Sequence, residues 1–228
     1  MPIRLVIFDV AGTITEDRDE VLAAFRTALQ NNGIEAEESH LREWKGASKR
    51  EVIRHFVERQ PRVASGGTDA RVKRIYEDFR GILEGHYHRN GVSPIAGAQN
   101  TFDWLRNHDI RLATTTGFYR ELNDLILQQA GWQRTFNATI CSDDVPVGRP
   151  APFMIFRAME AAKVLDVAQV INVGDTPLDL QAGSNAGVRG VVGVLTGAHS
   201  AERLRQERHT HILGSIVELP DLVEKLGS

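Results

Sequence analysis

The chain has 228 residues, of which 42% are hydrophobic and 25% are charged, and this balance is typical of a globular protein with a substantial core. A formal net charge of −3, with lysine and arginine spread along the chain, argues against nucleic acid as a partner. The single cysteine, Cys141, excludes an intrachain disulfide and a cysteine-based zinc site.

The first predicted element is a buried strand over residues 3–8, which runs into the turn DVAGT. This apolar run is too short for a signal peptide or a membrane span, so we expect a cytoplasmic protein without a membrane partner. Apolar residues at helical spacing then predict three helices, over residues 17–32, 48–59 and 68–88. No stretch between residues 15 and 90 has the pattern of a strand, which indicates a helical insert. Its most linker-like part is Arg62–Thr68.

Strands and helices alternate after the insert. Strands are predicted at residues 110–113, 138–141, 170–173 and 190–194, and helices at 98–107, 120–130, 152–162 and 178–186. This alternation is typical of an α/β fold, a Rossmann-like doubly wound parallel sheet with a helical cap inserted after the first strand. We expect residues 1–14 and 92–228 to form the catalytic core and residues 15–91 to form the cap.

Polar side chains follow several predicted strands, where a parallel sheet binds its ligands. Asp9 follows the first strand, Thr114–Thr116 the second, and Asp175 a later one, with Asp179 four residues further on. A lone aspartate after a strand is usually a turn or a helix cap. Several carboxylates at one edge instead indicate a site for a small hard cation, and Mg²⁺ is the ion that such ligands suit beside a phosphate.

Four short motifs in order resemble the signature of the haloacid dehalogenase-like phosphotransferases: DVAGT, TTTG, the Arg149 of GRP, and GDTPLD. The resemblance implies that Asp9 attacks phosphorus and forms an aspartyl phosphate, while Arg149 neutralises charge. It also implies a set of binding residues. Thr114, Thr116, Gly117 and Arg149 would bind the phosphoryl group, and Asp9, the backbone of Ala11, Asp175 and Asp179 would bind Mg²⁺.

Ala11 is the informative departure, because most phosphatases of this family have a second aspartate there that acts as general acid. Alanine at this position resembles the phosphonatase branch, as do the segments TTTGF, SDDVPVGRP and WKGASKREVI. In that branch a lysine of the insert forms a Schiff base with the substrate aldehyde, which makes an acid beside the nucleophile unnecessary. Lys49 matches that lysine, and we expect Lys45 and Arg50 to lower its pKa.

Two functions remain open at this point. The first is cleavage of a C–P bond, in phosphonoacetaldehyde or a related carbonyl phosphonate, through a Lys49 Schiff base. The second is a magnesium-dependent phosphomonoesterase acting on a small ester such as a sugar phosphate or phosphoglycolate, with Lys49 an ordinary solvated lysine. The branch has methionine and histidine where this chain has Lys45 and Val52, and tyrosine where it has Phe118. A receiver-like phospho-acceptor domain fits poorly because such domains lack the insert. The resemblance also implies a possible homodimer.

Overall fold

The computed structural model describes residues 1–60 and 67–227, and within them lies a parallel sheet of six strands in the order β3-β2-β1-β4-β5-β6. The strands are β1 (Leu5–Phe8), β2 (Arg111–Thr116), β3 (Ala138–Cys141), β4 (Val170–Gly174), β5 (Gly190–Val194) and β6 (His211–Leu213). The strand order reverses around β1, which has β2 on one side and β4 on the other. The predicted α/β fold is confirmed, and the residue after β1 lies where such sheets bind ligands.

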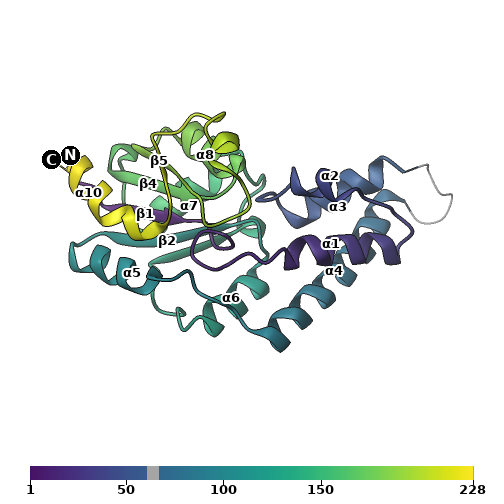
Figure 1. Cartoon of the computed structure of the whole chain (residues 1–228). Helices are drawn as coiled ribbons and strands as arrows, with labels where there is room; N and C mark the ends of the chain where they lie inside the picture. Colours follow the sequence, from purple (N-terminus) through teal and green to yellow (C-terminus); the bar gives the residue numbers. More distant parts are fainter. Residues whose placement is uncertain (61–66, 228) are drawn as a thin grey trace.

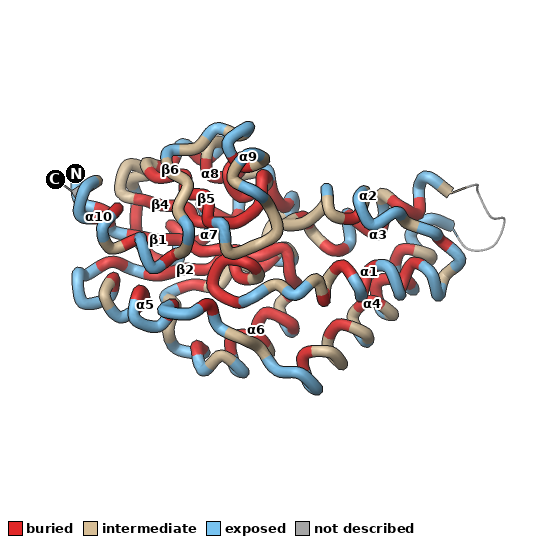
Figure 2. The backbone as a smooth tube through the Cα atoms, viewed as in Figure 1, coloured by how far each residue is buried: buried red, intermediate tan, exposed pale blue. Residues whose placement is uncertain are grey.

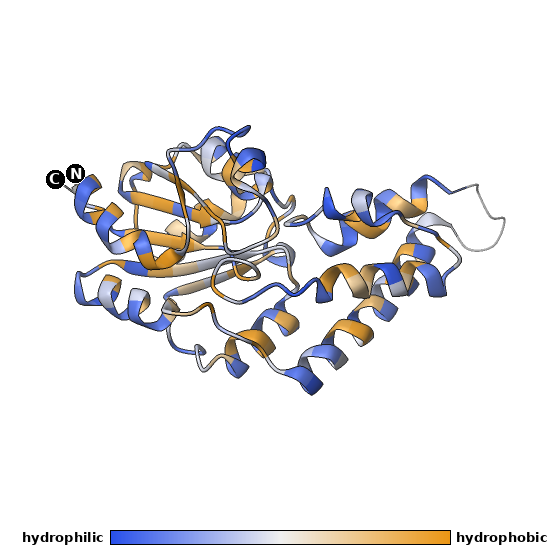
Figure 3. Ribbon diagram, viewed as in Figure 1, coloured by the Kyte–Doolittle hydropathy of each residue, from blue (hydrophilic) through white to orange (hydrophobic). Residues whose placement is uncertain are grey.

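Side chains alternate along each strand, so apolar strands present apolar side chains to both faces of the sheet, and helices cover both faces. In β1, Val6 and Phe8 belong to one apolar cluster and Leu5 and Ile7 to the other. The first cluster includes side chains of α5 (Ala98–Asn107), α6 (Arg120–Gln129) and α10 (Leu219–Gly227), and the second those of α7 (Phe153–Ala161), α8 (Pro177–Ala186) and α9 (Ala201–Leu204). Strands β1, β4 and β5 are buried throughout (Figure 2) and are also strongly apolar (Figure 3).

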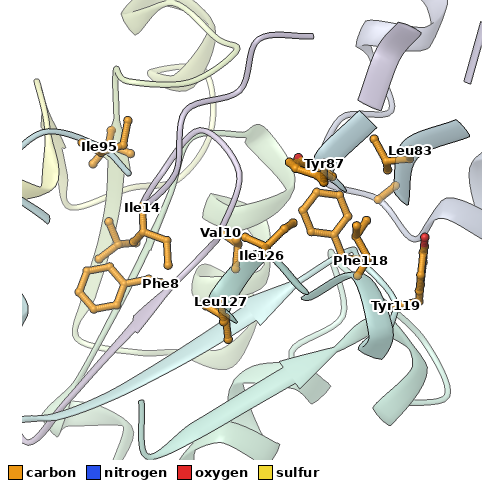
Figure 4. Packing of buried hydrophobic residues seen from close by; sticks show 14 of the residues in the cluster. Phe8, Val10, Ile14, Leu83, Tyr87, Ile95, Phe118, Tyr119, Ile126 and Leu127 are labelled. Atoms are coloured by element: carbon orange, nitrogen blue, oxygen red, sulfur yellow. The ribbon is translucent and has the colours of Figure 1, made fainter. Parts of the chain in front are cut away.

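The insert consists of α1 (Glu20–Asn31), α2 (Glu38–Arg42), α3 (Lys49–Glu58) and α4 (Thr68–Asn90), which lie together beside the sheet (Figure 1). The rings of Phe25 and Phe79 stack with centroids 4.3 Å apart and join α1 to α4. Apolar packing continues from α4 to the segment after β2, because Leu83 and Tyr87 of α4 belong to the same cluster as Phe118 of that segment (Figure 4). The insert and the sheet therefore share one core.

Most predicted elements are present, with boundaries that differ by a few residues. Strand β2 extends to Thr116, because β-branched threonines suit a strand as well as the apolar residues before them do. Helices α2, α9 and α10 and strand β6 were not predicted from the sequence. Of the linker-like stretch, residues 62–66 lie outside the described part, and Thr68 begins α4. Among the residues described, no helix has the length and apolar character needed to cross a membrane.

Candidate active site

Three carboxylates meet at the carboxyl end of the sheet. Asp9 follows β1 and Asp175 follows β4, and these strands pair with Phe8 opposite Val173. Asp179 joins them from the first turn of α8, where the backbone N–H and hydroxyl of Thr176 donate to its Oδ2 at 3.0 and 2.6 Å. One oxygen from each carboxylate lies within 4.8 Å of the others, and all three residues are buried.

Arg149 is the cation of this cluster. Its Nη1 donates to Asp9 Oδ1 at 2.8 Å and lies 2.7 Å from Asp179 Oδ1. Its Nη2 donates to the carbonyl and hydroxyl oxygens of Thr115 at 2.7 and 2.9 Å. Because Nη1 and Nη2 are both hydrogen-bonded and Arg149 is only 5% exposed, the position of the guanidinium relative to Asp9 is well defined.

The cluster has more negative charge than Arg149 balances. Burial raises the pKa of Asp9 to about 6, although the charge of Arg149 opposes the shift. Burial, with repulsion from Asp9 and Asp179, raises the pKa of Asp175 well above its usual value. A divalent cation among the three carboxylates relieves this repulsion and favours their ionised forms. The all-oxygen donor set therefore fits Mg²⁺.

The turn after β1 fits closely around Asp175. The Thr13 hydroxyl donates to Asp175 Oδ1 at 3.2 Å, and the Ala198 N–H donates to Oδ2 at 3.0 Å. Gly12 has a φ of +84°, and a Cβ on it would lie 2.6 Å from Asp175 Oδ2. Only glycine fits there, which explains the glycine of the DVAGT motif.

A cavity lies between this cluster and the insert. It contains about 540 Å³ of empty space, part of it open to solvent, and both halves of the chain line it. Asp9, Ala11, Thr116, Gly117, Phe118, Asp175 and Thr176 line it from the sheet side, and Asp17, Val21, Leu22, Phe25, Leu41, Trp44, Lys45, Gly46 and Lys49 line it from the insert and its N-terminal connection. The site thus combines a polar end, at Asp9 and Asp175, with a largely apolar wall on the side of the insert.

The insert lies directly against the sheet-end loops. A Cβ on Gly46 would lie 2.6 Å from the Thr176 hydroxyl, and a Cβ on Gly117 would lie 2.6 Å from the Ala47 carbonyl oxygen. Neither approach leaves room for another side chain: the Gly46 backbone lies against the Thr176 side chain, and the Gly117 backbone lies against the backbone of Gly46 and Ala47. The segment just before α3 therefore lies against these loops, and Lys49 at the start of α3 lines the same cavity as Asp9.

Lys49 is the first residue of α3 and is 7% exposed. Its Nζ donates to the Ala47 carbonyl at 3.3 Å and lies 4.8 Å from the centre of the Phe118 ring. Burial lowers the pKa of Lys49 to about 8, against the opposing effect of Asp9. This buried environment does not match a solvated surface lysine, and it favours a reactive amine.

The expected cause of that shift needs correction. Lys45 contributes only a minor part of the lowered pKa, after burial and Arg149, and Arg50 is not among its main causes. The Arg50 guanidinium lies over the Tyr76 ring, 4.3 Å from its centre. Loss of contact with water matters most because the charged ammonium has little in the apolar cavity to replace its hydration.

The threonine motif divides between two faces. Thr116 lines the cavity beside Gly117, whereas Thr114, two residues back along β2, is completely buried and is not among the lining residues. Thr115 points the other way and binds Arg149. Of the three threonines, Thr116 is therefore the one whose surroundings include the cavity.

Sequence reasoning missed the part that Asp17 plays in the cavity wall. Its carboxylate pairs with Lys45, and no motif pointed to this. Trp44 also lines the cavity. Val52 is completely buried in the insert, and the His55 ring lies against the Trp44 ring with centroids 4.2 Å apart. Neither Val52 nor His55 is among the residues that line the cavity.

Comparison with known proteins agrees with this geometry. The family model described as haloacid dehalogenase-like hydrolase matches residues 6–193. The chain belongs to the haloacid dehalogenase-like hydrolases. It is therefore a hydrolytic enzyme, of a family that typically uses Mg²⁺.

The relatives of this hydrolase include phosphonatases. A Bacillus cereus protein named phosphonoacetaldehyde hydrolase is 33% identical over 98% of this chain and 86% of its own length. A solved structure of a phosphonoacetaldehyde hydrolase-like protein from Oleispira antarctica superposes with a TM-score of 0.86 at 25% identity, covering 100% of this chain and 93% of that one. A predicted phosphoglycolate phosphatase from Haemophilus somnus, with a TM-score of 0.80 at 19% identity and coverage of 96% and 97%, shares the fold.

Proposed function

We propose that this hydrolase cleaves the C–P bond of phosphonoacetaldehyde or a related carbonyl phosphonate, through a Lys49 imine and an Asp9 aspartyl phosphate. The main supporting observation is a buried lysine with a pKa of about 8 in the cavity that contains Asp9. Ala11, beside the nucleophile, supplies no acid for a leaving alkoxide. The similarity to proteins named phosphonoacetaldehyde hydrolase supports the same reaction.

The first half of the reaction is imine formation. The uncharged Nζ of Lys49 adds to the carbonyl carbon, and the carbonyl oxygen leaves as water, which gives a protonated imine. The apolar wall and the Phe118 ring keep bulk water away from this nitrogen. The positive nitrogen lies two bonds from the carbon that is attached to phosphorus, so it can accept the electron pair of the breaking bond.

The second half is transfer of the phosphoryl group. A carboxylate oxygen of Asp9 attacks phosphorus, the C–P bond breaks, and its electron pair forms the C=C bond of an enamine. Water then hydrolyses the aspartyl phosphate to phosphate, while protonation of the enamine carbon and hydrolysis of the imine release acetaldehyde and free Lys49. The overall change adds one water molecule to phosphonoacetaldehyde.

Charge is the obstacle to this attack, since carboxylate and phosphonate are both anionic. Arg149 offsets part of the charge on Asp9, and we propose that Thr116 and Gly117, which line the same cavity, contact the phosphonate oxygens. We propose that Asp9, Asp175, Asp179 and the backbone of Ala11 hold Mg²⁺. When bound, the ion supplies electrostatic neutralisation of the phosphoryl oxygens.

We further propose that residues 15–91 act as a cap over a core formed by residues 1–14 and 92–228. Lys49 is on the cap side and Asp9 on the core side, so the two reacting groups meet only when the parts are closed, as they are at Gly46 and Gly117. Opening would admit substrate and release product.

A phosphomonoesterase remains the second candidate, because the phosphoryl half of the site does not depend on Lys49. Asp9, Arg149 and the acidic cluster suit an ester as well as a phosphonate. Such an ester would leave as an alkoxide and would need a proton donor that Ala11 does not provide.

A phosphate-release screen decides between the two. The purified protein is assayed with phosphonoacetaldehyde, phosphoglycolate and sugar phosphates, with and without Mg²⁺. We expect release from phosphonoacetaldehyde in Mg²⁺ and its loss in Lys49→Arg, which keeps the positive charge but forms no imine. Equal release from esters, or full activity in Lys49→Arg, would favour the phosphomonoesterase.

A further inference from the structure

A buried ion pair lies in the cavity wall and has no part in the proposed reaction. Lys45 Nζ lies 2.7 Å from Asp17 Oδ2 and 2.7 Å from Asp19 Oδ1. The side chains of Lys45 and Asp17 are 11% and 8% exposed. Both line the cavity that contains Asp9 and Lys49, whereas Asp19 does not.

The pair stands out because the cavity wall around it is apolar. Aliphatic and aromatic side chains of the insert make up the rest of that side: Val21, Leu22, Phe25, Leu41 and Trp44. A buried ion pair often stabilises a fold no more than apolar residues of the same size would. A few polar groups in an apolar cavity are what orients a ligand.

The hydrogen-bonding capacity of the pair is not exhausted. An ammonium has three N–H donors, and Lys45 uses two of them on Asp17 and Asp19. Asp17 Oδ2 accepts from Lys45 and Oδ1 accepts from the Asp19 N–H at 2.9 Å, and each oxygen keeps a further lone pair. One free donor and free acceptor sites therefore lie side by side.

The two lysines of the cavity differ in charge state. Burial alone would lower the pKa of Lys45, but its hydrogen bonds to Asp17 and Asp19 outweigh burial and raise it. Lys49 lacks a carboxylate partner, and burial lowers its pKa to about 8. Lys45 is thus a permanent cation suited to binding, and Lys49 an amine suited to reaction.

Building on the proposed C–P cleavage, we infer that Lys45 and Asp17 bind a hydroxyl group of the substrate. The carbon that bears this hydroxyl is bonded to the carbonyl carbon, on the side away from phosphorus. A hydroxyl accepts from Lys45 and donates to Asp17, which matches the free donor and acceptor. The substrate class is then a β-keto phosphonate with a neighbouring hydroxyl. Its simplest member is 3-hydroxy-2-oxopropylphosphonate.

Two ketones that differ only in this hydroxyl test the inference. Phosphate release is measured for 3-hydroxy-2-oxopropylphosphonate and for 2-oxopropylphosphonate. A hydrogen bond to a charged group is worth on the order of tenfold to a hundredfold in affinity, so we expect kcat/KM to favour the hydroxylated ketone by at least about tenfold. Lys45→Met is expected to bring this ratio close to one.

Two further variants guard against a loss of folding. Lys45→Met leaves Asp17 buried without its cation, so the double variant Lys45→Met with Asp17→Asn is measured as well, and we expect the same loss of preference. Arg42→Met is the matched control. Arg42 also pairs with Asp19, at 2.9 Å, but lies outside the cavity lining, so the ratio should not change.

The results separate this inference from the function on which it rests. If no phosphonate releases phosphate, phosphonoacetaldehyde included, the proposed function fails and the inference with it. If phosphonoacetaldehyde is cleaved but the two ketones are inert or equally good, only the hydroxyl-binding role is overturned. A preference that survives in folded Lys45→Met also overturns it.

Discussion

Imine formation by Lys49 should follow a pH profile that its buried position sets. Only the uncharged amine attacks a carbonyl. With a pKa of about 8, roughly one tenth of the molecules have the free amine at pH 7, against about one in 3,000 for an ordinary lysine of pKa 10.5. Burial therefore raises the reactive fraction about 300-fold.

Reductive trapping measures this fraction. The enzyme is mixed with phosphonoacetaldehyde and cyanoborohydride at a series of pH values, and the covalent adduct is followed by intact mass and located by peptide mapping. We expect the initial trapping rate to rise about tenfold from pH 6 to 7, about fivefold from pH 7 to 8, and to level off above pH 9. Lys73, which is 74% exposed, lies in the same chain and serves as an internal control that should be labelled far more slowly than Lys49 at pH 7.

Three results would refute this reasoning. A rate that keeps rising tenfold per unit through pH 10 would mean that Lys49 titrates like a solvated lysine. An adduct located on another lysine would remove Lys49 from the reaction. Equal trapping in Lys49→Arg would do the same, because arginine forms no stable imine under these conditions.

Three further predictions concern the phosphoryl half of the site and the closed cap. Asp9→Asn should lower the rate of phosphate release by about 10⁴-fold or more, since the attacking oxygen is lost, and a variant within tenfold of the wild type would exclude a nucleophilic role. Mg²⁺ should raise the melting temperature of the protein, because it relieves the repulsion that raises the pKa of Asp175. EDTA should reverse this rise, and Asp175→Asn should abolish it. A rise in melting temperature that is unchanged in Asp175→Asn would mean that the ion binds elsewhere. Gly117→Ala should reduce kcat/KM at least about tenfold, because the added Cβ would lie 2.6 Å from the Ala47 carbonyl oxygen and keep the cap from closing. The control is Gly81→Ala on α4, which has open space around it and should leave activity intact. Equal activity of the two glycine variants would argue against the closed form as the reactive one.

Local patterns in the sequence were enough to predict the fold class and the position of Asp9. Alternating apolar strands and amphipathic helices are properties of short segments, so their periodicity appears without any knowledge of the fold. Helix α5 and strand β3 have the predicted bounds for this reason. Elements such as α2 and β6 were missed because five and three residues are too few to show a period.

Motifs at strand ends also predicted which residues gather. Parallel strands end at one edge of the sheet, so Asp9 and Asp175 come together once the strand order is known. Side chains alternate along β2, so Thr115 and Thr116 lie on opposite faces of the sheet. Which face each threonine takes depends on how β2 pairs with β1 and β3, and the run of threonines alone does not reveal it.

The sequence by itself determined an α/β fold, and by resemblance it indicated a hydrolase with Asp9 as the nucleophile and Lys49 as a reactive residue of the insert. The tertiary structure decided that Lys49 is buried against Phe118, which lowers its pKa, and that Lys45 stays charged beside Asp17. Both lysines belong to one short stretch of similar composition. Their difference comes from what other parts of the chain place around them, because desolvation and ion pairing depend on neighbours in space and not on neighbours in sequence.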